Sequence, residues 1–121
     1  MAVGDVVTYK KLSASTGGKA ILVAATTASG TLCHTATTVG TGMDKVFLYA
    51  VNNHTASLAV TCHFGGSTDP NHVIVKTVPN DDGAVLLVPG FPLQSGSTVR
   101  VYAAFASVVS VYGEVWAVTA T

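Results

Sequence analysis

Short runs of β-branched and aromatic residues recur along the chain, and glycine, proline, asparagine or aspartate separates each run from the next. Helical periodicity is hard to find, whereas such runs are typical of strands. The pattern predicts about eight strands. They cover residues 19–25, 31–35, 45–52, 57–64, 72–78, 84–88, 98–105 and 109–119. Short strands without intervening helices predict an all-β fold, an antiparallel β-sandwich, and a count of eight makes a jelly roll the expected form.

The breaks between the strands carry turn chemistry. Residues 52–55, NNHT, predict a tight hairpin, and residues 65–71 predict a longer loop. Residues 79–83, PNDDG, predict a turn whose glycine tolerates a positive φ.

The first residues differ from the rest, because SASTGG at 13–18 is small, polar and flexible. We therefore expect a flexible N-terminal arm at residues 1–18 and one β-sandwich domain at residues 19–121. Simple fraying of a terminus is the alternative to an arm that becomes ordered against a neighbour.

Several predicted strands are apolar on both faces. In DKVFLYAVNN both alternating sets are apolar, and VSVYGEVWAV places aromatic residues on the outward set. Alternation is lost where a sheet is covered on both sides, and tyrosine and tryptophan are favoured at interfaces. The pattern predicts a subunit interface, and the alternative is a sandwich with a few exposed aromatic residues. The interface candidates are Phe47, Tyr49, Tyr102, Tyr112 and Trp116.

Composition supports burial between subunits and argues against other partners. Hydrophobic residues make up 49% of the chain and charged residues 10%, with a mean hydropathy of +0.51. The apolar runs are too short to span a membrane as a helix, which needs about 20 residues. The formal net charge of +0 gives no field to attract nucleic acid. The first residues do not resemble a secretory signal, so we expect synthesis in a cytoplasm.

Two Cys-His pairs raise the question of a metal or thiol site: Cys33-His34 and Cys62-His63. Neighbouring side chains on a strand point to opposite faces, so neither pair can ligate one ion without a bend or bulge. The spacing matches no zinc pattern, and we expect both thiols in the core, with no metal, cofactor or catalytic residue. Residues 80–83, NDDG, suit a turn better than a calcium loop.

Two segments together carry a family resemblance. They are DKVFLYAVNNHTASLAVTCHFGGSTDPNHVIVKTVPNDDGAVLLVPGFPL and GSTVRVYAAFASVVSVYGEV, and the FGGSTDP loop and the VPGFPL turn are their most distinctive parts. This pattern resembles small virion proteins of tailed bacteriophages, including capsid decoration or cement proteins, over about residues 20–118. The resemblance implies a trimeric β-sandwich or jelly roll on the lattice of the major capsid protein, and it supplies no catalytic residue.

The sequence therefore predicts a non-enzymatic virion protein of the capsid surface. Its expected partners are copies of itself, with a trimer first, and the major capsid protein, with no direct contact to nucleic acid or membrane. The alternative is a carbohydrate- or receptor-binding sandwich module on a phage tail or appendage, because jelly rolls also serve as lectins.

Overall fold

A computed structural model describes residues 6–39, 42–66, 68 and 70–119. Nine strands and no helix run through this part of the chain, so no described segment could cross a membrane as a helix. The strands are β1 (Val6–Lys11), β2 (Ile21–Val23), β3 (Thr31–Thr35), β4 (Met43–Asn52), β5 (Leu58–Phe64), β6 (Val73–Val78), β7 (Val85–Leu93), β8 (Thr98–Ala103) and β9 (Val109–Thr119).

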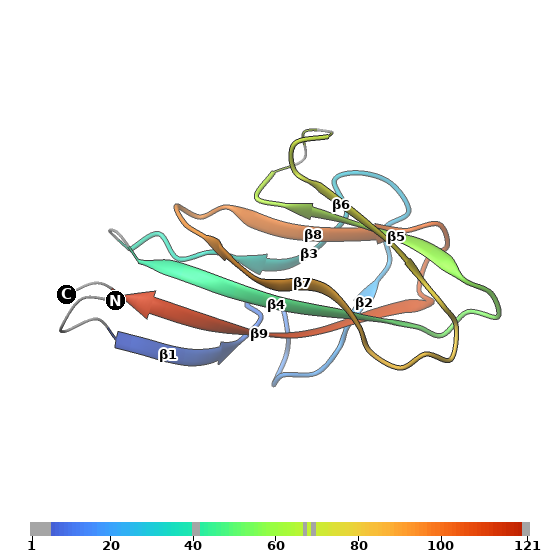
Figure 1. The fold of residues 1–121 in the computed structure, drawn as a ribbon, viewed down its shortest axis with the longest axis horizontal. Coiled ribbons are helices and arrows are strands. Elements are labelled where there is room, and N and C mark those ends of the chain that lie inside the picture. Colours follow the sequence, from blue (N-terminus) through green and yellow to red (C-terminus); the bar gives the residue numbers. More distant parts are fainter. Residues whose placement is uncertain (1–5, 40–41, 67, 69, 120–121) are drawn as a thin grey trace.

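The strands form two antiparallel sheets, which confirms the predicted all-β fold and is consistent with a β-sandwich (Figure 1). The five-stranded sheet has the order β1-β9-β4-β7, with β2 also paired to β9, and the four-stranded sheet has the order β3-β8-β5-β6. Apart from β1, the pairing is nested along the chain: β5 pairs with β6, β4 with β7, β3 with β8 and β2 with β9. The chain therefore crosses repeatedly from one sheet to the other.

The core lies between the two sheets, and the alternation of buried and partly exposed residues is clearest in β4. Along β4 the buried residues are every second one, including Val46, Leu48 and Ala50. Their partners from the other sheet include Val60 and Val101, both fully buried. Such β-branched side chains suit a pleated, covered surface, and burial of apolar area stabilises the fold by about 25 cal/mol per Å².

Residues 6–18 do not form a separate arm, so the N-terminal arm expected from the sequence is not confirmed. β1 pairs with β9 from Val6 opposite Thr119 to Lys11 opposite Glu114. Leu12 then turns into the core, where 1% of its surface is exposed, and packs over Gly113 of β9. β1 can form here because β2 pairs with only one part of β9 and leaves the rest of that edge free. Residues 1–5 of the predicted arm lie outside the described residues.

The predicted hairpin at residues 52–55 is wrong, because β4 and β5 belong to different sheets. The connection is a corner held by the buried Asn52. Its Nδ2 donates to the carbonyls of Ala56 and Val78, both at 2.9 Å, and its Oδ1 accepts from the backbone N–H of His54 at 2.8 Å. By contrast, β5 and β6, on either side of the predicted loop at residues 65–71, do pair with each other.

β7 extends to Leu93, well past the end that the sequence predicts at residue 88. Proline stops a central strand because it lacks an N–H, but Pro89 and Pro92 lie on an edge strand, where one row of N–H groups is not needed. Two register shifts in the β4–β7 ladder accommodate the irregular stretch. The other seven predicted strands occur with shifted ends or unchanged, and β1 is additional.

Candidate functional site

An aromatic surface covers the outer side of the five-stranded sheet. We call it the aromatic face, and it consists of Tyr9, Phe47, Tyr49, Tyr112 and Trp116. The register fixes this grouping, because Tyr9 lies opposite Trp116 and Tyr49 opposite Tyr112. Directly opposite residues of antiparallel strands share a face, and the alternate positions of β4 and β9 fill the core. These side chains therefore point away from the core.

Trp116 is the centre of the aromatic face. The ring of Tyr9 meets it edge-on at 5.2 Å between centroids, and the ring of Phe47 lies tilted at 5.1 Å. Such offset and edge-to-face arrangements are the favourable geometries for aromatic pairs. Phe47 lies over Gly90 of β7, where a Cβ atom would come within 2.8 Å of the Phe47 ring. Among the described residues, the buried indole Nε1 of Trp116 has no hydrogen-bond partner.

Part of the aromatic face is open to solvent. Tyr9 is 69% exposed and Tyr112 is 46% exposed, and Leu86 of β7, opposite Tyr49, is 44% exposed. Charged side chains of both signs border these rings: Lys11 lies opposite Glu114, and Lys45 lies opposite Trp116. The face thus combines apolar area, polar handles and mixed charge, which is typical of protein contact surfaces.

Four of the five interface residues predicted from the sequence lie together on this face, and Tyr102 does not. Tyr102 is on β8 in the other sheet, where its ring meets His63 edge-on at 5.4 Å. Tyr9 was not among the predicted interface residues, because it lies in the segment expected to form the arm. The β-branched and aromatic residues of VVTYKK suit a strand, but no alternation of apolar and polar positions marks one there.

The two Cys-His pairs behave differently from each other. In β5 the expected alternation holds: Cys62 lies in the core, and His63 points to the other face, although it is 4% exposed rather than open. In β3 both Cys33 and His34 are fully buried, because a bulge between Leu32 and His34 shifts the register. Burial raises the pKa of both thiols to about 12, with the nearby Cys62 thiol adding to the effect on Cys33.

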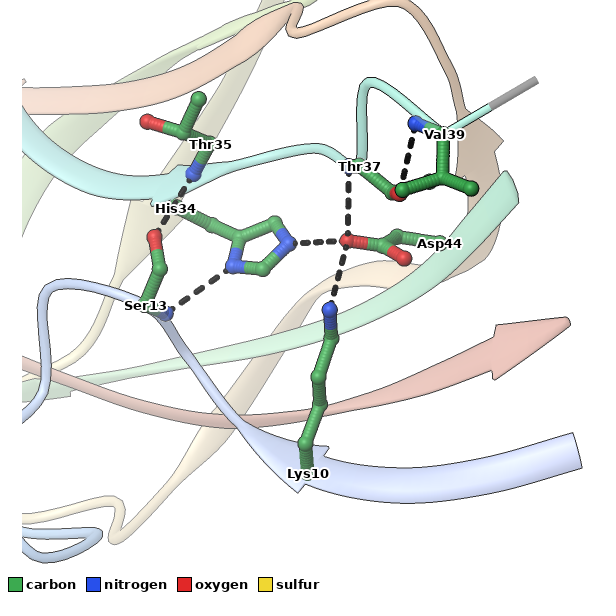
Figure 2. Close-up of polar contacts among 7 residues, drawn as sticks. All are labelled: Lys10, Ser13, His34, Thr35, Thr37, Val39 and Asp44. Atoms are coloured by element: carbon green, nitrogen blue, oxygen red, sulfur yellow. Dashed lines mark hydrogen bonds and ion pairs between the residues drawn. The ribbon is translucent and has the colours of Figure 1, made fainter. Parts of the chain in front are cut away.

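Because of the bulge, the side chain of His34 points into a buried polar cluster that links the two sheets (Figure 2). We call it the His34 cluster, and it consists of Lys10, Ser13, His34, Thr37 and Asp44. Oδ2 of the fully buried Asp44 accepts from Nε2 of His34 at 2.7 Å and from the backbone N–H of Thr37 at 3.3 Å, and Nζ of Lys10 lies 3.3 Å from it. The backbone N–H of Ser13 donates to Nδ1 of His34 at 3.0 Å.

The cluster contains serine, histidine and aspartate, but it is not connected as a nucleophile with its base. The hydroxyl of Ser13 accepts from the backbone N–H of Thr35 at 2.8 Å, and only the backbone of Ser13 bonds to the imidazole. Both ring nitrogens of His34 are engaged, so neither can take a proton from a hydroxyl nucleophile as catalysis requires. The arrangement instead gives partners to both ring nitrogens of His34 and to Oδ2 of Asp44, and it ties the N-terminal segment to β3 and β4. Among the described residues, the buried Oδ1 of Asp44 has no hydrogen-bond partner.

The rest of the described chain adds no further candidate of this kind. Its residues form no pocket and bring no three His, Cys, Asp or Glu side chains together as a metal site would require. Comparison with protein-family models, with curated proteins and with solved structures found no match for this chain. The site assignment therefore depends on the geometry described above.

Proposed function

We propose that this chain is a non-enzymatic structural protein of a phage virion, a decoration protein that stabilises the capsid by bridging major capsid protein subunits. One observation carries the proposal: an aromatic face, open to solvent in part, lies on a sheet of a low-charge sandwich. Exposed apolar patches of this kind mark contact surfaces. The sequence resemblance to decoration proteins supplies the biological setting.

A second copy of this chain is the occupant that suits the aromatic face. The face carries Lys11, Lys45 and Glu114, and among the described residues none of the three forms an ion pair within the chain. Symmetric association can therefore place Glu114 of one copy near a lysine of another. The formal net charge of +0 means that copies do not repel each other. We expect a homo-oligomer, with a trimer as the first candidate.

We further propose that the sandwich is a jelly roll. The nested pairing supports this, because β2 with β9, β3 with β8, β4 with β7 and β5 with β6 is the pairing of one long hairpin rolled into two sheets. The two resulting sets, β2-β9-β4-β7 and β3-β8-β5-β6, each contain four antiparallel strands, as in double Greek-key sandwiches. β1 is an addition at the edge of the first set.

The mechanism needs no bond chemistry. Each apolar contact between subunits contributes about 25 cal/mol per Å² of apolar area buried. The contacts repeat over a symmetric shell, so a modest contribution at each boundary sums to a large resistance against the outward pressure of the packaged genome.

The test is made on particles of the phage that encodes the chain. We expect the protein on the outer capsid surface, and particles lacking it should release DNA at a lower temperature than complete particles. A matched control is a particle reconstituted with purified protein, which should regain the heat resistance. Particles that stay equally heat-stable without the protein but fail to adsorb to cells would replace this proposal with the receptor- or carbohydrate-binding module.

A further inference from the structure

We propose that the His34 cluster is a pH-sensitive latch, which holds residues 6–15 on the sandwich at neutral pH and releases them in acid. The segment comprises β1 and the turn that follows it. This inference does not depend on the proposed virion role, because the buried His34 cluster carries it; the released segment does include Tyr9 of the aromatic face.

The hydrogen bonds identify the protonation state of His34 that the fold requires. Nδ1 accepts from the backbone N–H of Ser13, so Nδ1 carries no proton. Nε2 must then carry the proton and donate it to Asp44. The closed latch is thus the neutral Nε2–H form of the imidazole. A second proton on Nδ1 would face the N–H of Ser13, and two donors cannot bond to each other.

The surroundings of His34 also favour its neutral form. Burial lowers the pKa of His34, and the positive charge of Lys10 acts in the same direction, against the hydrogen bond and the charge of Asp44. Among the described residues, Asp44 of β4 and Lys10 of β1 are the charged groups that act on the ring, while β8 places the uncharged Val99 opposite it. A second proton on His34 would therefore place another positive charge at a site where the ammonium of Lys10 already lies next to the carboxylate of Asp44.

The sign of the pH effect follows from the direction of this shift. The pKa of His34 is lower in the closed state than in an open, solvated one, so the open state binds more protons in acid. The stability that the latch contributes is present above the ordinary pKa of 6.5 and is lost as the pH falls toward the lowered value. Within that window the opening constant rises about ten-fold per pH unit.

The segment can open without unfolding the sandwich. All six residues of β1 are exposed. The strand is held by the ladder to β9, by the contact of Tyr9 with Trp116 and by the ion pair of Lys10 with Asp44. Beyond β1, Leu12 and Ser15 are the buried residues of the segment, and Ala14 donates from its backbone to the carbonyl of Cys33 at 3.2 Å. Segments with few buried contacts open locally at a lower free energy than the whole domain. The core between β4, β9 and the second sheet remains in place.

Amide hydrogen exchange of the full chain at pH 7.5 and pH 5.5, corrected for the intrinsic pH dependence of exchange, tests the latch. We expect protection of residues 6–15 to fall between pH 7.5 and pH 5.5, by up to about ten-fold, while β5 and β8 keep their protection. The fluorescence of Trp116, which is the one tryptophan of the chain, should change over the same range as Tyr9 leaves it. An equal loss of protection across all strands, or no loss in the segment, would overturn the proposal.

Two variants separate His34 from the other histidines. His34→Gln keeps an uncharged acceptor and donor, so its residues 6–15 should show no acid-dependent loss of protection. His54→Gln is the matched control, since His54 stacks on Phe105 at 4.7 Å far from the cluster, and it should behave as the wild type. Acid-dependent opening that persists in His34→Gln would contradict the latch.

Imidazole ¹⁵N NMR of the wild-type protein keeps the proposal testable if His34→Gln does not fold. At pH 7.5 the spectrum of His34 should show an unprotonated Nδ1 and a protonated Nε2. A proton on Nδ1 in the folded protein at that pH would overturn the proposal.

Discussion

Leu12 lies where the chain leaves β1 and enters the core, directly above Gly113 of β9. A Cβ atom on residue 113 would meet the carbonyl oxygen of Phe47 and come within 3.1 Å of Leu12, so the glycine provides the space that the leucine fills. The side chain of Leu12 and the absence of a side chain at Gly113 together fix the course of the N-terminal segment.

Replacing Leu12 with Ala should lower the free energy of unfolding by about 2–5 kcal/mol, because it removes a fully buried side chain and leaves a cavity above Gly113. Leu22→Ala is the matched control, since Leu22 is 53% exposed and should change stability by less than about 0.5 kcal/mol. Urea unfolding measures both. Equal values for the two variants would show that Leu12 is not in the core.

The two thiols should stay protonated and unreactive in the folded protein at neutral pH. Burial raises their pKa to about 12 from an ordinary value of 9.0, so their contribution to stability is complete below pH 9 and is lost as the pH rises toward 12. We expect no reaction with a thiol reagent until the chain unfolds. The double variant with Cys33→Val and Cys62→Val should lose part of the alkaline destabilisation, and rapid labelling of the native protein would contradict this account.

Among the elements, short runs of β-branched and aromatic residues separated by turn residues were enough to predict eight of the strands and the antiparallel two-sheet fold. β1 was missed because its side chains are all exposed, and its place depends on the free edge of β9 rather than on its own pattern. The His34 cluster was missed for a related reason. His34 and Asp44 meet only because a bulge in β3 reverses the expected facing, and no spacing in the sequence reveals a bulge. Likewise, the sequence could not separate a hairpin from a corner at Asn52.

The irregular part of β7 helps to position the aromatic face, because Gly90 lies against the ring of Phe47. Gly90 has φ of 100°, and a Cβ atom there would collide with the Phe47 ring. Gly90→Ala should therefore displace Phe47 from Trp116 and destabilise the fold by about 1–3 kcal/mol. The emission of Trp116 should shift, and the control Gly83→Ala, also at positive φ but with open space around it, should leave the emission unchanged. Unchanged emission in Gly90→Ala would mean that Gly90 does not position these rings.

In the whole molecule, the two faces of the five-stranded sheet have different roles. The inner face forms the core with the second sheet, and the outer face presents the aromatic face together with charges of both signs. Repetition of one such surface by symmetry is how small structural proteins build large assemblies. The proposed virion role depends on this outer face taking part in contacts.

Sedimentation of the purified protein over a wide concentration range tests that claim most directly. We expect the wild type to sediment as a homo-oligomer, and Tyr112→Asp to shift it to the monomer by placing a charge in the contact. Val75→Asp is the matched control, because Val75 is 61% exposed but lies on β6 of the other sheet, and it should leave the oligomer intact. A wild-type protein that stays monomeric at all concentrations, or an oligomer that Tyr112→Asp does not weaken, would contradict the proposed role of the aromatic face.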